Sequence, residues 1–185
     1  MFAIDIETLG NVHNSVITQI AAVEFTHKRI YRCYSTNVSI ESCEEIGLVK
    51  TKSTVEWWKL NGNKYHAIGV STLDIDKALK ELFIFANPLF ENYIWSKGTN
   101  FDLNILETAY TLCEKHYPGF TFVAPWKYNR KLDMRTAFKL FPEKINPGKP
   151  PHNALADILM QTRLLIDNIP DRLEAILKKQ EENNG

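Results

Sequence analysis

Apolar and polar residues alternate over the first seven positions of the chain, as they do in a β-strand that is buried on one side. Phe2, Ile4 and Ile6 would face one side of this strand, and Asp5 and Glu7 would face the other. Neighbouring carboxylates on one strand face repel each other. They are tolerated either where the face is fully hydrated or where a hard cation lies between them. The pair alone leaves both interpretations open.

The same pattern predicts a meander of three strands followed by helices. Segments 16–26 and 29–40 are rich in β-formers, and short connections make the three strands antiparallel neighbours. Residues 41–52 are polar without clear periodicity. Apolar positions at helical spacing predict an amphipathic helix over 72–87, and residues 92–96 form a short apolar run typical of a buried strand.

Two further helices are predicted in the second half, over 101–117 and 152–168, each with an apolar stripe. Strands that alternate with helices favour an α/β fold with a mixed sheet, antiparallel in its first three strands and parallel afterwards. We expect residues 1–170 to form one domain, and residues 171–185 to form a charged C-terminal helix and tail.

A short helix is predicted over 52–59, because Ser53 or the following threonine can cap it and Glu56 completes a capping box. Trp57 and Trp58 are adjacent, so a helix must point them in different directions. Both could pack at the edge of the core. Alternatively, one of them provides a platform on which a nucleobase stacks.

Composition narrows the class of protein. The chain has 185 residues and balances 22 basic against 22 acidic side chains, so it is no polycation that coats nucleic acid. Its three cysteines have unrelated spacings that suit a reducing cytoplasm better than disulfides or zinc. It begins directly with a strand and contains no apolar run of membrane-spanning length. We therefore expect a cytoplasmic protein without a membrane partner.

Two more acidic positions stand where a metal ligand would be expected. Asp102 lies in the first turn of a helix, directly after a strand, where open α/β sheets bind ligands. Asp157 lies within a mostly apolar helix, about 140° around an ideal helix from His152. His152 would therefore reach over the site from the helix entrance. Simpler interpretations also exist. Asp102 would be an acidic residue favoured by the dipole at the start of its helix, and Asp157 would be an acidic residue on the protein surface.

Residues 126–149 are locally basic, with seven Lys or Arg against two acidic residues and with interleaved aromatic side chains. A solvated helix face has the same composition. Placed just before His152, the segment could also contact phosphates.

Asp5, Glu7, Asp102 and Asp157 together offer only oxygen ligands, which favour Mg²⁺ or Mn²⁺ over zinc. Four carboxylates can hold two ions about 3.5–4 Å apart, as in two-metal phosphodiester hydrolysis. His152 has the side chain suited to accept a proton from the attacking water at neutral pH.

The order Asp-x-Glu, mid-chain Asp and His-x-x-x-x-Asp resembles the DEDDh group of 3′–5′ exonucleases, which have an RNase H-like fold. The segments 51–59, 133–136 and 156–160 are similar to T4-type phage exonuclease A and to related bacterial exoribonuclease-like domains. This resemblance implies that the four carboxylates are metal ligands and that His152 is the general base. It also implies that Thr8 and Leu9 lie against the 3′-terminal nucleotide, with Leu9 as a wedge under its base. Further candidate substrate contacts are Trp57, Trp58, Asn100, Phe101 and Arg135, of which Arg135 would contact phosphate while Asp133 orients it.

The expected function is a metal-dependent 3′–5′ exonuclease that releases nucleoside 5′-monophosphates from single strands, in a bacterial cell or encoded by a phage. DNA is slightly favoured by the phage-like segments, and an exoribonuclease acting on short or overhanging RNA is the near alternative. A catalytically inactive nucleic-acid-binding module is a second alternative, although loss of catalysis would normally replace a carboxylate or the histidine. A phosphohydrolase that does not act on polynucleotides, or a structural domain with coincidental acids, is a third.

Overall fold

The fold is built on one six-stranded mixed sheet in the computed structural model of the chain, which describes residues 1–61, 72–86, 92–140 and 152–184. The strand order is β4-β3-β2-β1-β5-β6. The strands are β1 (Phe2–Thr8), β2 (Ile17–Phe25), β3 (Ile30–Val38), β4 (Thr72–Leu73), β5 (Ile94–Ser96) and β6 (Lys131–Asp133). β1, β2 and β3 are antiparallel neighbours, whereas β4, β5 and β6 each pair in parallel. The predicted α/β class and the change from antiparallel to parallel pairing are confirmed.

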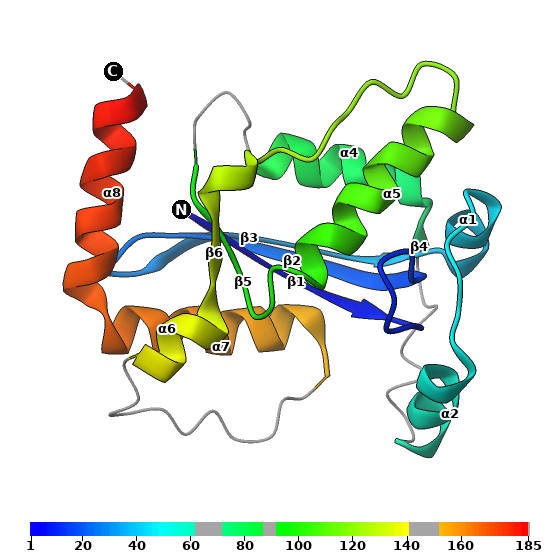
Figure 1. Cartoon of the computed structure of the whole chain (residues 1–185), viewed down its shortest axis with the longest axis horizontal. Helices are drawn as coiled ribbons and strands as arrows, with labels where there is room; N and C mark the ends of the chain where they lie inside the picture. The colour runs from blue at the N-terminus through cyan, green and yellow to red at the C-terminus, as the bar shows by residue number, and fades with distance from the viewer. Residues whose placement is uncertain (62–71, 87–91, 141–151, 185) are drawn as a thin grey trace.

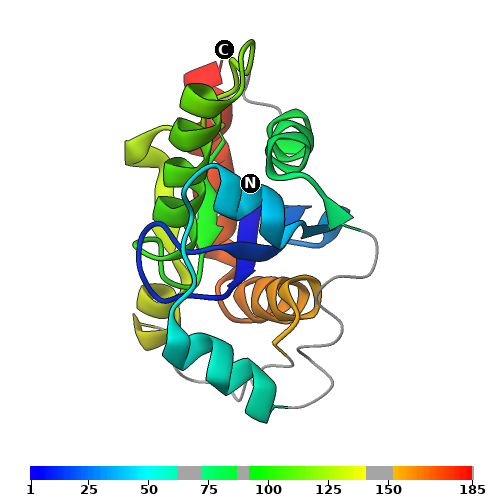
Figure 2. The same ribbon diagram turned by 90° about the vertical axis from the view of Figure 1, so that its right-hand side faces the viewer.

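Helices cover both faces of the sheet (Figures 1 and 2). They are α1 (Ile40–Glu45), α2 (Lys52–Leu60), α4 (Ile75–Ala86), α5 (Asp102–His116), α6 (Met134–Leu140), α7 (Ala154–Asn168) and α8 (Pro170–Asn184). α4 and α5 pack on one face, where they share a hydrophobic cluster with β1 and β2. α6, α7 and α8 share a second cluster on the opposite face.

The alternation along β1 divides its side chains between these two clusters. Phe2, Ile4 and Ile6 belong to the α4/α5 cluster, and Ala3 belongs to the α7 cluster. Asp5 stands two positions after Ala3 and therefore points to the α7 side of the sheet. Asp5 and Glu7 of β1 thus face α7, the helix that contains Asp157.

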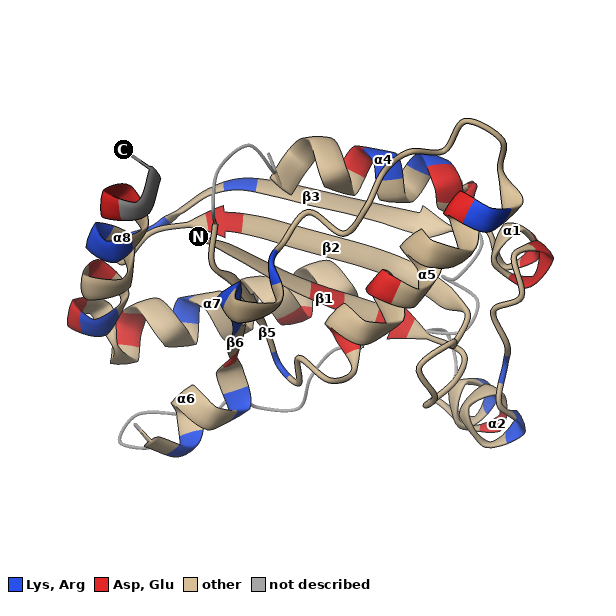
Figure 3. Ribbon diagram, turned by 45° about the horizontal axis from the view of Figure 1, so that its top comes forward, with Lys and Arg blue, Asp and Glu red and all other residues tan. Residues whose placement is uncertain are grey.

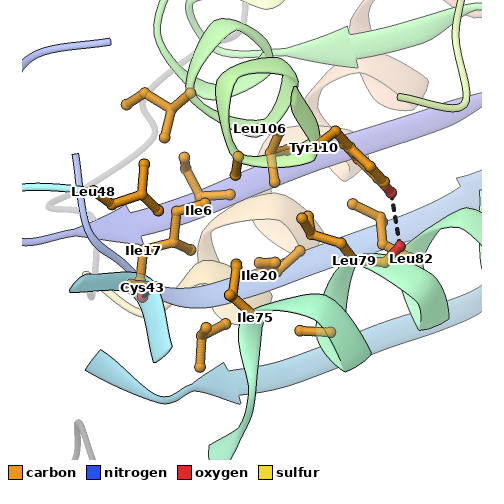
Figure 4. Close-up of a cluster of buried hydrophobic side chains, with 14 of the residues drawn as sticks. Ile6, Ile17, Ile20, Cys43, Leu48, Ile75, Leu79, Leu82, Leu106 and Tyr110 are labelled. Carbon is orange, nitrogen blue, oxygen red and sulfur yellow. Dashed lines mark hydrogen bonds between the residues drawn. The ribbon is translucent and has the colours of Figure 1, made fainter. Parts of the chain in front are cut away.

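Side chains of β1, β2, α1, α4 and α5 meet in the α4/α5 cluster (Figure 4). Ile6, Ile20, Leu79 and Leu106 meet there with at most 5% of their surface exposed. The buried Tyr110 hydroxyl donates a hydrogen bond to the carbonyl oxygen of Leu79 at 2.7 Å, which ties α5 to α4. Burial of each large apolar side chain contributes roughly 1.5–3 kcal/mol, so this cluster holds the sheet beneath the site rigidly.

Several local predictions differ from the structure. The stretch after β3 contains α1, which Ser39 caps by accepting a hydrogen bond from the Ser42 amide. α2 begins at Lys52, as predicted, but its N-cap is Thr51 instead of Ser53 or Thr54, and Thr51 makes no side-chain capping bond. α7 starts at Ala154, because the Asn153 side chain caps it by accepting from the Ala156 amide.

The C-terminal segment is helical through Asn184, and Leu173 of α8 is fully buried in the α7 cluster. Across the described parts of the chain, no helix combines the length and the apolar character needed to cross a membrane.

Candidate metal centre

Three of the four predicted ligands meet in one place. Asp5 and Glu7 of β1 and Asp157 of α7 each offer a carboxylate oxygen, and these atoms lie within 4.8 Å of one another. In Figure 3 the acidic segments of β1, of α7 and of the start of α5 lie in the same region of the molecule. Residues separated by about 150 positions in the chain therefore form one acidic centre.

The first turn of α7 is attached to the sheet through Gln19. This residue of β2 pairs opposite Glu7 of β1. Its side-chain oxygen accepts a hydrogen bond from the Ala154 amide at 3.2 Å, and its side-chain nitrogen donates to Asn37 at 3.0 Å. Ala154 is 1% exposed, and its small side chain lets α7 approach the sheet closely enough for Asp157 to reach β1.

Asp157 is buried, with 4% of its surface exposed. One carboxylate oxygen accepts a hydrogen bond from the Asn153 amide at 3.3 Å. The other oxygen, Oδ1, is buried without a hydrogen-bond partner among the described residues. A buried acceptor without a partner is costly in a protein interior, and a bound cation would satisfy it. This oxygen is the observation that makes the centre fit a metal ion.

Asp102 lies beside this group, outside the three mutually close oxygens. It is 5% exposed in the first turn of α5, and burial raises the pKa of its carboxyl from 3.8 to about 7. Hydrogen bonding from the Ile6 backbone and the positive charge of Arg135 oppose that rise in pKa. The carboxyl is close enough to Asp5 for its charge to raise the pKa of Asp5.

The pKa of Asp5 is raised well above its usual range, first by burial and then by the charges of Asp102, Glu7 and Asp157. A hydrogen bond from the Gln161 side chain lowers that pKa. The pKa of Asp157 is raised by burial and lowered by the Asn153 backbone and by His152. Buried acids that repel one another need positive charge between them in order to ionise together. Divalent cations would supply that charge.

His152 stands at the entrance to α7, two residues before the helix begins. Its backbone is in the left-handed region, with φ 52°, which a residue with a side chain adopts rarely. Its ring meets Trp57 edge to face, with centroids 4.7 Å apart. His152 therefore lies at the entrance of α7, outside the helix itself.

The tryptophan pair divides as predicted, one side chain inward and one outward. Trp58 is 3% exposed and joins the α4/α5 cluster, whereas Trp57 is 39% exposed. A nucleobase could therefore stack on Trp57, but Trp58 offers no free ring face.

The expected substrate contacts at the end of β1 do not fit their surroundings. Leu9 is fully buried in the core, so its side chain cannot wedge under a terminal base. Thr8 is 6% exposed, and its hydroxyl donates to the Gly10 carbonyl oxygen at 2.7 Å. Asn100 is exposed and Phe101 half-buried at the start of α5, where a substrate could reach them.

Asp133 and Arg135 have structural roles that the sequence does not indicate. Asp133 caps α6 by accepting from the Arg135 amide at 2.6 Å, and it also accepts from the Thr99 amide at 3.3 Å. Gly98 has φ +120°, and a β-carbon there would lie 3.3 Å from Cζ of Arg135. The exposed Arg135 guanidinium thus packs on the loop that carries Asp102.

The basic segment is less available for phosphate than predicted. Arg130 is 8% exposed, with its guanidinium 4.7 Å from the centre of the Tyr93 ring. Lys131 forms an ion pair with Glu107 at 2.5 Å. The part of the segment beyond Leu140 lies outside the described residues.

Two residues of the site had no assigned role in the sequence. Gln19 attaches α7 to the sheet, and only the strand register reveals its position. Gln161 hydrogen-bonds to Asp5 and is 3% exposed, one helical turn after Asp157. Its spacing of four positions from Asp157 is the signal that could have identified it.

Residues 1–167 match the family of 3′–5′ exoribonuclease Rv2179c-like domains. The chain has no match among curated protein sequences.

Solved structures of exonuclease I share the fold. One exonuclease I structure matches with a TM-score of 0.63 and 14% identity, over 96% of this chain and 43% of that one. The zinc-bound complex of Escherichia coli exonuclease I with single-stranded DNA matches with a TM-score of 0.63 and 13% identity, over 96% and 42%. The enzyme from Methylocaldum szegediense matches with a TM-score of 0.62 and 11% identity, over 96% and 42%. The chain therefore spans less than half the length of these proteins, and the predicted RNase H-like, exonuclease-type fold is confirmed.

Proposed function

The chain belongs to the family of 3′–5′ exoribonuclease Rv2179c-like domains, and from this membership we propose that it is a metal-dependent 3′–5′ exonuclease. It would shorten single strands from their 3′ ends and release nucleoside 5′-monophosphates. The observation that carries the proposal is the meeting of Asp5, Glu7 and Asp157, whose oxygens lie within 4.8 Å of one another.

The residues that would hold metal are these three carboxylates together with Asp102. Their oxygens suit Mg²⁺ or Mn²⁺, and four carboxylates suffice for two ions. Bound ions would supply Lewis-acid stabilisation of the phosphate and a more acidic water. The protein's own part is to hold these oxygens in place, which it does through Gln19 at the start of α7 and through Gln161 beside Asp5.

His152 is the proposed general base. It lies at the entrance of α7, and its charge lowers the pKa of the buried Asp157, so the two side chains are near each other. An imidazole at this position could take a proton from a water that attacks the terminal phosphodiester. Asn100, Phe101 and Trp57 are the accessible candidates for contact with the last nucleotides.

RNA is the first candidate substrate, because the family that matches residues 1–167 is described as an exoribonuclease domain. Single-stranded DNA is the second, because the exonuclease I structures of the same fold include complexes with DNA oligonucleotides. A contact to the ribose 2′-hydroxyl would distinguish the two.

The test is a gel assay on matched 5′-labelled RNA and DNA oligomers with Mg²⁺, Mn²⁺ or EDTA. A ladder that shortens from the 3′ end, requires metal and disappears in Asp157→Asn supports the proposal, and the faster substrate identifies the class. If the folded protein binds the oligomers without shortening either of them in the presence of metal, the proposal is wrong and a binding module is favoured.

A further inference from the structure

Trp57 makes ring contacts that a free stacking platform would not make. Its ring stands edge to face against His152, with centroids 4.7 Å apart and an interplanar angle of 74°. It also stands edge to face against Trp58, with centroids 5.1 Å apart and an angle of 82°. The side chain is 39% exposed, so part of its surface is already covered by these neighbours.

Trp58 attaches α2, and with it Trp57, to β1, the strand that carries the proposed metal ligands Asp5 and Glu7. Its indole N–H donates a hydrogen bond to the Thr8 carbonyl oxygen at 2.9 Å, and the side chain is 3% exposed. Thr8 directly follows Glu7. The position of Trp57 relative to the acidic centre is therefore set by a buried hydrogen bond between α2 and the end of β1. Figure 2 shows α2 and the start of α7 at the same end of the sheet.

His152 depends on external contacts for its conformation. It precedes the helix cap Asn153, and its backbone amide hydrogen-bonds to the carboxylate of Asp157 in α7. Its φ of 52° is a conformation that surrounding contacts must stabilise in a residue with a β-carbon. Trp57 and Trp58 both contact its ring, with centroids at 4.7 Å and 6.2 Å.

We propose that Trp57 is the positioning residue for His152 and that base stacking is not its main role. The inference rests on the proposed function, in which His152 acts as the general base. α2 then links the two halves of the site: Trp58 is anchored to β1, and Trp57 holds the imidazole at the entrance of α7. Loss of the Trp57 ring displaces the base while leaving the four carboxylates in place.

Kinetics separate positioning from stacking. Trp57→Leu should lower kcat about 10- to 100-fold, since general-base catalysis is worth about 10²–10⁴-fold and a misplaced group loses much of it. KM should change less than about threefold, and Trp57→Phe should retain most of the activity because it keeps a ring against His152. Leu60→Gln is the matched control, since Leu60 is on the same helix and is 86% exposed.

A double-mutant cycle gives the decisive comparison. In a His152→Ala background, Trp57→Leu should lower kcat less than twofold further, because Trp57 acts through the imidazole. If Trp57→Leu raises KM with kcat unchanged, or lowers activity equally with and without His152, the positioning role is wrong and stacking is favoured.

A second readout needs neither metal nor turnover. The ring protons of His152 should be shifted by the neighbouring indoles in NMR spectra of the labelled protein, and His152→Ala identifies its signal among the five histidines. Trp57→Leu should move this signal toward the position of a free imidazole, while Leu60→Gln leaves it unchanged. An unmoved signal in folded Trp57→Leu overturns the proposal whether or not the protein cleaves nucleic acid. If Trp57→Leu does not fold, Trp57→Phe provides the same test with a smaller shift.

Discussion

Asp102→Asn should make the metal-free protein more stable at pH 8, although it should impair the proposed activity. The substitution keeps the shape of a side chain that is 5% exposed and removes its negative charge. In the folded protein that charge lies in a buried site and repels Asp5. In the unfolded chain it is hydrated.

The size of the effect follows from the pKa of this carboxyl, which burial raises from 3.8 to about 7. At about 1.4 kcal/mol for each pKa unit, ionised Asp102 costs the folded state about 4 kcal/mol. The sign follows from proton binding. Between pH 4 and pH 7 the folded state binds more protons at this group, so stability falls as the pH rises. The whole cost is present above pH 7, and none of it remains below pH 4.

The measurement is urea unfolding in EDTA at pH 4 and pH 8, for the wild type and for Asp102→Asn. The variant should gain up to about 4 kcal/mol over the wild type at pH 8 and close to nothing at pH 4. Asp76→Asn is a matched control, because Asp76 is half-buried and also lies in the first turn of a helix, α4. Its difference from the wild type should be small at both pH values.

Repeating the unfolding of the wild type and of Asp102→Asn with Mg²⁺ in place of EDTA tests whether repulsion among the carboxylates causes the loss of stability. An ion among the carboxylates would stabilise the wild type by about 2.7 kcal/mol at a hundredfold excess over its Kd, and the variant by less. A stability difference that is equal at pH 4 and pH 8 would contradict the electrostatic reasoning. So would an Asp102→Asn protein that is less stable than the wild type at pH 8.

Asp157→Asn should remove cleavage and abolish the rise in Tm on addition of Mn²⁺ while the protein stays folded; near-wild-type turnover would show that Asp157 is not a ligand. His152→Ala should lower kcat by about 10²–10⁴-fold and keep the Mn²⁺ shift in Tm, and loss of that shift would make His152 a ligand instead of a base. Trp58→Ala should cost about 3–5 kcal/mol in urea unfolding because it empties a buried site, whereas Trp57→Ala should cost under about 1 kcal/mol. Equal losses of unfolding free energy in Trp58→Ala and Trp57→Ala would contradict the expectation drawn from their different burial.

Much of the fold could be predicted from short-range patterns. Alternation in β1 places Asp5 on a different face from Ile4 and Ile6, and the apolar stripes of α4, α5 and α7 agree with their buried residues. These patterns are reliable because the side-chain period follows directly from backbone geometry. Shorter elements were missed: β4 and β6 have two and three residues, and they exist only because a neighbouring strand completes their hydrogen bonds.

The sequence by itself therefore determined the α/β class, the family motifs and the residue types of the acidic centre. Only the tertiary structure decided which side chains share that centre and which are enclosed. Gln19 meets Ala154 across 135 positions, and Trp58 meets Thr8 across 50. Leu9 is enclosed by the core although its neighbours carry the site. Long-range contacts of this kind depend on how whole elements pack, and no local period encodes them.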